Sequence, residues 1–133
     1  VEEFLLNASV ISVMAQRLVR RICEYCSEPD PNSAAILLEH DIQKIVQAYQ
    51  LQPNICRGKG CEHCGGTGFK GRVAILEYLP NDENIQSLPK DHTFLLKVAE
   101  YRRNNALRTL REDGYIKILK GKTTYEEVLR VAG

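Results

Sequence analysis

Four of the five cysteines form two short pairs of a kind that binds metal ions. Cys23 and Cys26 make one Cys-x-x-Cys motif, and Cys61 and Cys64 make a second. Two thiolates at this spacing lie on one tight turn, so a single ion can bind both. Two such turns supply four sulfurs, the tetrahedral set that Zn²⁺ prefers. The spacing therefore predicts a structural zinc site with these four cysteines as the metal ligands.

A glycine-rich run follows the second pair. Residues 65–68 read Gly-Gly-Thr-Gly, and glycine lets the backbone fold closely around a metal-bound sulfur. Backbone N–H groups in such a turn can point at the charged thiolates. The run therefore strengthens the prediction of a metal site.

Other uses of the cysteines stay open: iron held as in rubredoxin, redox chemistry and disulfide bonds. Two disulfides need an oxidising compartment and leave Cys56 over. A redox role for one pair does not explain why there are two. Because the repeated spacing leaves Cys56 out, we expect it to be a small apolar side chain near the site. His63 lies inside the second motif, but four cysteines already complete the shell of the metal.

The composition is that of an ordinary globular protein with one modest core. The chain has 133 residues, of which 44% are apolar and 26% are charged. Its net charge of +1 argues against a general polyanion binder. No apolar run approaches the roughly 20 residues that cross a bilayer. The chain begins at Val1 without an initiator methionine, so we expect it to be part of a larger protein.

The elements that position the cysteines are predicted to be mostly helical. Residues 3–22 are expected to form a helix, because apolar side chains such as Met14 and Leu18 recur at helical spacing. A second helical segment runs from residue 32 to about residue 51, and Asp41 marks the point where it divides. The predicted buried stripe of this segment consists of Leu38, Ile42, Ile45 and Tyr49.

Extended segments are predicted around and after the second cysteine pair. Residues 53–58 and 67–72 read as short strands or arms, and residues 73–79 form an apolar, β-rich strand. The predicted fold class is α+β: mostly helical, with a small four-cysteine zinc-binding insertion and one or a few short strands. Further helices are expected over residues 82–88, 93–102 and 105–120.

Two signals near the C-terminus predict where helices end and begin. Gly121 stands where a helix-ending glycine belongs, and Thr124 with Glu127 has the form of a capping box for a last helix. The letters Gly-Lys-Thr at 121–123 also imitate the tail of a phosphate-binding P-loop, but Ile116 stands where that motif requires a glycine. We therefore expect no nucleotide site here. No catalytic residue is predicted either, since no nucleophile is recognisably paired with a base.

Basic residues gather around the second cysteine pair in the sequence. Four thiolates around Zn²⁺ carry a net charge of about −2, so the simplest interpretation is that these cations compensate that charge. In the alternative interpretation, the chain is a zinc-ribbon module that binds nucleic acid through them. The residues concerned are Arg57, Lys59, Lys70 and Arg72.

A local resemblance points to a third class of protein. Cys61, Cys64, Gly66 and Gly68 fit the Cys-x-x-Cys-x-Gly-x-Gly repeat of J-domain co-chaperones. That family uses several such repeats, whereas the glycines are missing after Cys26. The resemblance implies a cysteine-rich module that captures unfolded proteins.

A wider resemblance covers essentially the whole chain. Several motifs occur in the same order as in the C-terminal third of the bacterial type II secretion and type IV pilus assembly ATPases. On these motifs the chain resembles that family. Besides the two cysteine pairs, the matching segments are residues 15–20, 67–72, 77–79, 107–114 and 123–131.

This resemblance implies a zinc-binding part of a larger motor. In the family, a RecA-like ATPase domain drives a hexamer at the cytoplasmic face of the inner membrane. A tetracysteine insertion in that domain holds zinc, and the positions that correspond are Cys23, Cys26, Cys61 and Cys64. The implied partners are neighbouring subunits of the homohexamer and an inner-membrane platform protein of a secretion or pilus machine.

The resemblance also implies a division of the chain and of its chemistry. Residues 1–22 would be the terminal helix of the RecA-like ATPase core, residues 23–72 the zinc-binding subdomain, and residues 73–133 a C-terminal strand and helical subdomain. The family's P-loop, acidic boxes and histidine box lie upstream of Val1, so ATP and Mg²⁺ are expected only in the longer parent. This chain is expected to have a structural, partner-contacting role without ATP hydrolysis of its own.

Overall fold

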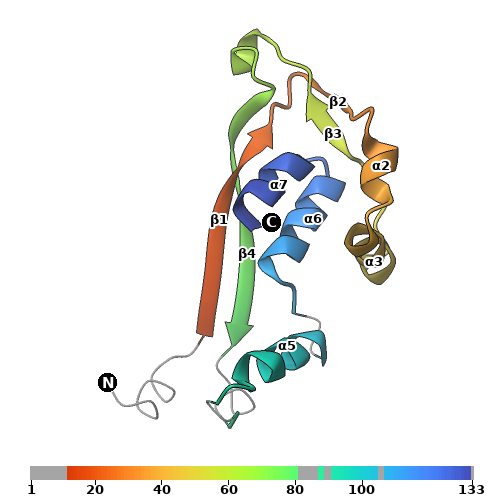
Figure 1. The fold of residues 1–133 in the computed structure, drawn as a ribbon. Helices are drawn as coiled ribbons and strands as arrows, with labels where there is room; N and C mark the ends of the chain where they lie inside the picture. Colours follow the sequence, from red (N-terminus) through yellow and green to blue (C-terminus); the bar gives the residue numbers. More distant parts are fainter. Residues whose placement is uncertain (1–11, 81–86, 89–90, 105–106, 133) are drawn as a thin grey trace.

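The computed structural model describes residues 12–80, 87–88, 91–104 and 107–132. These residues form an α+β fold. Its longest element is an antiparallel two-stranded ribbon made by β1 (Ser12–Ile22) and β4 (Phe69–Pro80). A shorter ribbon pairs β2 (Ser27–Pro29) with β3 (Cys56–Gly58). Figure 1 shows the β1–β2 turn and the β3–β4 loop at one end of the long ribbon.

Helices account for most of the other described segments. Between β2 and β3 lie α2 (Ser33–Leu37) and α3 (His40–Tyr49), and a short 3₁₀ turn, η1 (Glu62–Cys64), lies between β3 and β4. None of the described helices has the length and apolar character needed to cross a membrane. The helices that follow β4 in the chain are α5 (Phe94–Asn104), α6 (Leu110–Leu119) and α7 (Tyr125–Ala132).

The prediction of a helix over residues 3–22 is wrong where the structure tests it. Residues 12–22 form β1, and the rest of that segment lies outside the described residues. β1 pairs with β4 in continuous register as far as Arg20. Val19 is buried, whereas its neighbours Leu18 and Arg20 are exposed and point to the other face, as in a strand with one covered face. The long backbone partner offered by β4 therefore overrides the helical spacing of the apolar residues.

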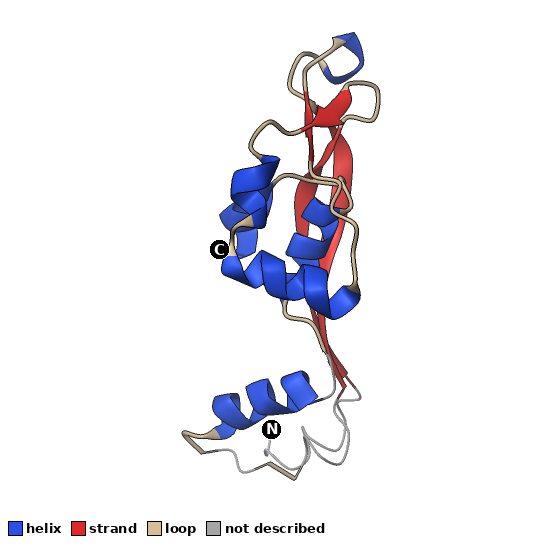
Figure 2. Ribbon diagram, turned by 90° about the vertical axis from the view of Figure 1, so that its right-hand side faces the viewer, coloured by secondary structure: helices blue, strands red, loops and turns tan. Residues whose placement is uncertain are grey.

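β4 is longer than the sequence suggested, because the arm expected at 67–72 and the strand expected at 73–79 join into one element. One face of the ribbon packs against α6 and α7 (Figure 2), and Ile75 on that face is fully buried. The N–H of Leu76 donates to the Asp113 carboxylate on α6 at 2.8 Å. This bond fixes the helix to the strand along the ribbon.

The helical segment predicted from residue 32 to residue 51 is confirmed as two helices. The break falls just before the predicted Asp41, because α2 ends at Leu37 and α3 begins at His40. Ile42 and Ile45 are buried as expected. Leu38 is 75% exposed and Tyr49 is 39% exposed, so the predicted stripe is wrong at both ends. Leu38 caps the end of α2 and does not lie on the inner face of α3.

The later helices agree with the prediction in outline. α5 and α6 correspond to the helices expected over residues 93–102 and 105–120. α6 begins only at Leu110, because Thr109 and Glu112 form a capping box there. The helix expected over residues 82–88 lies mostly outside the described residues.

The predicted helix signals near the C-terminus are confirmed, with one change. Gly121 ends α6 with φ +73°, and the Lys122 N–H donates to the Lys117 carbonyl at 2.9 Å, as in a glycine-ended helix. The Thr124 hydroxyl accepts from the Glu127 N–H at 3.3 Å and so caps α7. The Glu127 side chain does not complete the capping box, because it binds β1.

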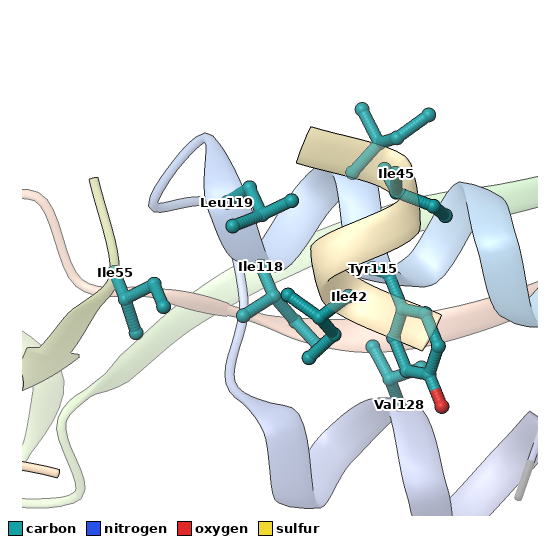
Figure 3. Packing of buried hydrophobic residues seen from close by; sticks show 8 residues of the cluster. Ile42, Ile45, Ile55, Tyr115, Ile118, Leu119 and Val128 are labelled. Carbon is teal, nitrogen blue, oxygen red and sulfur yellow. The ribbon is translucent and has the colours of Figure 1, made fainter. Parts of the chain in front are cut away.

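One hydrophobic core joins α3, α6 and α7 with the segment that precedes β3 (Figure 3). α6 and α7 approach closely at Gly114, where a Cβ would lie 2.5 Å from Cγ1 of Val128. α6 continues through Gly114 without interruption. The core residues are Ile42, Ile45, Ile55, Tyr115, Ile116, Ile118, Leu119 and Val128.

Candidate metal centre

The four cysteines lie in two loops at the same end of the long ribbon. Cys23 and Cys26 lie between β1 and β2, whereas Cys61 and Cys64 stand at the two ends of η1, between β3 and β4. β1 is paired with β4, and β2 is paired with β3. These two pairings bring the loops together (Figure 1).

The four sulfur atoms lie close enough together to share one metal ion, and three of their separations match a tetrahedral zinc site. Sγ–Sγ distances are 3.8 Å for Cys23 and Cys61, 3.8 Å for Cys26 and Cys64, and 3.7 Å for Cys61 and Cys64. All four atoms lie within 4.8 Å of one another. A Zn–S bond of about 2.3 Å in a tetrahedron places sulfurs roughly 3.8 Å apart. A disulfide would need about 2.05 Å, and all five cysteines are free. The donor set therefore fits a metal ion.

Backbone N–H groups point at two of the sulfurs. The N–H of Gly60 donates to Cys26 Sγ at 3.3 Å. Cys64 Sγ accepts two such bonds, from the N–H of Cys61 at 3.3 Å and from the N–H of Gly68 at 3.2 Å. Such bonds spread the negative charge of a thiolate and orient it toward a metal. The predicted role of the glycine-rich run is confirmed at Gly68.

The electrostatics of the cluster favour a cation. Desolvation raises the pKa of Cys26 to about 12, although the Gly60 N–H acts in the opposite direction. The N–H of Cys61 lowers the pKa of Cys64 to about 6. Four adjacent thiolates repel one another unless a positive charge lies between them. A divalent metal ion bound here would supply that charge and displace the protons of the remaining thiols.

Two glycines allow the chain to cross itself beneath the cysteine loops. A Cβ on Gly58 would lie 2.0 Å from the carbonyl oxygen of Gly68, and a Cβ on Gly68 would lie 2.5 Å from that of Gly58. Gly68 also has a φ of +83°, which other residues rarely adopt. Its carbonyl accepts the N–H of Cys23 at 2.9 Å. The crossing therefore joins the second loop to the first loop directly.

An aromatic stack connects the two cysteine motifs on the outside. Tyr25 and His63 occupy the same position in their respective motifs, and their rings stack with centroids 4.0 Å apart. The Lys70 ammonium lies 5.1 Å above the Tyr25 ring. His63 lies outside the group of four close ligand atoms. It therefore packs the site and does not compete for the metal in this arrangement.

Cys56 is a small packed side chain, as the sequence predicted. It is buried, and its Sγ lies 3.4 Å from the Asn54 carbonyl oxygen. The group of close ligand atoms does not include it. Its neighbour across the fold is Gly121, where a Cβ would lie 3.2 Å from the sulfur. Cys56 is thus a small packing residue between β3 and the end of α6.

The residues that anchor the cysteine-bearing end to the C-terminal helices were not among those predicted from the sequence. Glu127 is 2% exposed, and its carboxylate accepts from the Arg20 N–H at 3.0 Å. The Thr123 hydroxyl donates to the Arg20 carbonyl at 2.8 Å, and the Ile22 N–H donates to the Lys122 carbonyl at 2.9 Å. Ile22 directly precedes Cys23, so these hydrogen bonds fix where that cysteine lies. A local motif cannot reveal it, because the partners are about a hundred residues apart.

The pKa of the Glu127 carboxylate is lowered in the folded chain. Desolvation by burial acts to raise the pKa of Glu127, but the hydrogen bonds from Arg130 and Arg20 outweigh it and hold that pKa below its ordinary value. The carboxylate therefore stays charged at neutral pH.

Two of the basic residues near the site have partners in the fold. Arg57 forms an ion pair with Glu28 at 2.9 Å, and Lys70 lies over the Tyr25 ring.

Thr123, in the sequence that imitates a P-loop tail, is buried against β1, and Gly121 closes α6. This Gly-Lys-Thr segment is therefore a helix stop and an anchor in the fold.

The fold and the site together define a class: an α+β protein in which two paired ribbons carry a four-cysteine site that can bind a metal ion.

Comparison with known proteins narrows this class to one family. Residues 1–130 match the model of the family described as Type II/IV secretion system protein. The chain is 42% identical over 132 residues to the type IV pilus assembly ATPase PilB of Thermus thermophilus, covering 97% of this chain and 14% of that protein. It is 35% identical over 133 residues to type II secretion system protein E of Aeromonas hydrophila, covering 98% of this chain and 25% of that protein.

A third relative is the type IV pilus assembly ATPase TfpB of Acinetobacter baylyi, 36% identical over 136 residues, with 98% of this chain and 22% of that protein covered. The chain belongs to the Type II/IV secretion system protein family. It spans between 14% and 25% of the length of these relatives.

Proposed function

We propose that this chain is the zinc-binding, C-terminal part of a hexameric ATPase that powers type II protein secretion or type IV pilus assembly. The observation that carries the proposal is the cluster of four sulfurs at tetrahedral spacing, in a chain that matches secretion and pilus ATPases over almost its whole length. The parent would hydrolyse ATP, and this part would transmit or receive the resulting movement.

Cys23, Cys26, Cys61 and Cys64 would hold the zinc ion, which has a structural role. Tetrahedral sulfur ligation and the absence of an open coordination position are typical of structural zinc. Zinc binding in small motifs contributes roughly 10–16 kcal/mol at neutral pH, enough to order loops that otherwise have few apolar contacts. The site would make the end of the ribbon a rigid projection for contact with a neighbouring subunit or with the membrane platform protein.

The division of the parent follows from the same proposal. Residues 1–22 would lead out of a RecA-like ATPase core, residues 23–72 would form the zinc-binding subdomain, and residues 73–133 the C-terminal subdomain. ATP and Mg²⁺ would bind in the remainder of the parent, because the Gly-Lys-Thr segment of this chain closes α6. The assembled motor would work at the cytoplasmic face of the bacterial inner membrane.

Metal analysis of the purified chain, combined with matched cysteine variants, tests the zinc assignment. Elemental analysis should find one zinc per chain, and Cys61→Ser should lose most of it. Cys56→Ser should keep one zinc, because Cys56 lies outside the cluster. Stoichiometric iron, or ordered loops without metal, would contradict the assignment.

The motor role needs the full-length parent. Cys61→Ser in that protein should abolish secretion or pilus assembly, whereas Cys56→Ser should preserve it. The isolated chain should show no ATP hydrolysis above a buffer blank. Full secretion or piliation by the Cys61→Ser parent would overturn the structural role proposed for zinc.

A further inference from the structure

A hollow between the long ribbon and α7 is lined by three arginines. Arg20 comes from β1, Arg72 from β4 and Arg130 from α7, and Leu18 and Val19 complete the lining. Three elements far apart in sequence therefore bring guanidinium groups to one place, and the metal site uses none of them.

A buried carboxylate organises two of these arginines. The Glu127 side chain is only 3% exposed, and it accepts from Nε of Arg20 at 2.6 Å and from Nε of Arg130 at 2.9 Å. A guanidinium has five N–H donors in a rigid fork. Each of these contacts engages the Nε, so the terminal nitrogens keep the capacity to bind a second acceptor. The Arg20 guanidinium is further held 4.1 Å above the Phe69 ring.

Arg72 faces Arg20 across the ribbon. The two residues are direct cross-strand partners in the register of the ribbon, and like charges at such positions destabilise a strand pair. Within the part of the chain that the structure describes, no ion pair joins Arg72 to an acidic side chain. An anion between the two guanidinium groups would turn this repulsion into attraction.

The charge of the hollow indicates which anion fits. Three guanidinium groups and one carboxylate leave a net charge of +2. A phosphoryl group carries a charge of roughly −1.5 to −2 at neutral pH and presents three acceptor oxygens. Planar guanidinium forks bind such oxygens in pairs. A carboxylate, with a single charge and two oxygens, would leave the cluster uncompensated.

We propose that Arg20, Arg72 and Arg130 form a binding site for a phosphoryl group, with Glu127 as the residue that positions two of the three arginines. The phosphoryl group comes either from a soluble phosphate compound or from a phospholipid headgroup. The site requires neither the metal nor the assignment of the parent as a motor, so its test is independent of both.

Pyrophosphate binding to the zinc-loaded chain, measured by calorimetry at constant ionic strength, tests the proposal. The wild-type chain should bind saturably, and Arg72→Gln should weaken binding roughly tenfold or more. Arg72→Gln should fold normally, because no acidic side chain among the described residues pairs with Arg72. Lys44→Gln removes the same charge from an exposed position on α3 and should leave the affinity unchanged. Arg72→Lys should bind more weakly than wild type, since it keeps the charge and loses the fork.

Two further arms separate the sources of the phosphoryl group. Sedimentation with phosphatidic acid vesicles, repeated with Arg72→Gln, tests a lipid headgroup, and pyrophosphate alone tests a soluble compound. Binding in either arm that depends on Arg72 supports the site and identifies its source. Acetate should not bind. The proposal is overturned if neither probe binds, if Arg72→Gln and Lys44→Gln weaken binding equally, or if acetate binds as well as pyrophosphate.

Discussion

Replacing Glu127 by alanine removes the carboxylate that fastens α7 to β1. In the folded chain this carboxylate accepts three hydrogen bonds: from the backbone N–H and Nε of Arg20, and from Nε of Arg130. No other acceptor is in place for the Arg20 N–H among the described residues, so the substitution leaves that donor unpaired at the edge of β1.

The loss of unfolding free energy in Glu127→Ala depends on how exposed each hydrogen-bonding partner of the carboxylate is. A hydrogen bond to a charged acceptor is worth about 1.5–3 kcal/mol when it is shielded from water, and the backbone bond to the 3%-exposed carboxylate falls in this class. The two arginine side chains are 55% and 58% exposed, so solvent screening reduces each ion pair to about 0.5 kcal/mol or less. Glu127→Ala should therefore lower the free energy of unfolding by about 2–4 kcal/mol.

Urea unfolding of the zinc-loaded chain measures this loss, and amide hydrogen exchange locates it. Exchange should accelerate at the Arg20 amide and along the first turn of α7. Glu126→Ala is the matched control, because Glu126 occupies the same helical turn and is exposed. It should change the free energy of unfolding by less than about 0.5 kcal/mol. Equal losses in the two variants, or an unaltered Arg20 amide in Glu127→Ala, would refute the reasoning.

Three other predictions concern the Glu127 carboxylate, the glycine crossing and the cysteine loops. The folded pKa of Glu127 lies below its unfolded value, so the charged carboxylate stabilises the fold above about pH 4.5, and this stabilisation is lost as the pH falls through the folded pKa. The free energy of unfolding of wild type should therefore fall more steeply below about pH 4.5 than that of Glu127→Gln. Gly68→Ala and Gly65→Ala both place alanine at a positive φ, at a cost of about 1–2 kcal/mol, but only Gly68 meets a backbone oxygen, at 2.5 Å. Gly68→Ala should therefore be clearly less stable and bind zinc more weakly, and equal effects would contradict the backbone crossing. Removal of the metal by a chelator should increase hydrogen exchange first at residues 23–30 and 56–68, while α6 stays protected by the hydrophobic core. A uniform increase along the chain would argue against that order.

The cysteine cluster shows how far local spacing can be extrapolated. Each Cys-x-x-Cys turn is short enough to be specified by neighbouring residues, and two such turns have one good chemical use, so the set of four was predictable. The strand pairing that brings the two turns together was not predictable from the spacing. Nothing in the spacing indicates that the first pair follows a strand and that this strand pairs with the one after the second pair.

β1 illustrates why the prediction failed there. Met14 and Leu18 recur at helical spacing, yet they are 62% and 47% exposed, while Val19, which directly follows Leu18, is buried. A strand becomes favourable only when a partner supplies its hydrogen bonds. The paired residues of that partner lie between 47 and 68 positions further along the chain, and its presence cannot be read from the residues of β1.

By itself, the sequence determined the features that depend on neighbouring residues: the four cysteines on two turns, the glycine that closes α6, the threonine that caps α7 and the division of the second helical segment. Tertiary structure alone decided that residues 12–22 extend as a strand, that Glu127 binds β1 and that three arginines meet beside it. The physical reason is distance along the chain: a turn or a cap is stabilised by residues a few positions away, whereas a strand pair or a buried ion pair forms only after remote segments have packed together.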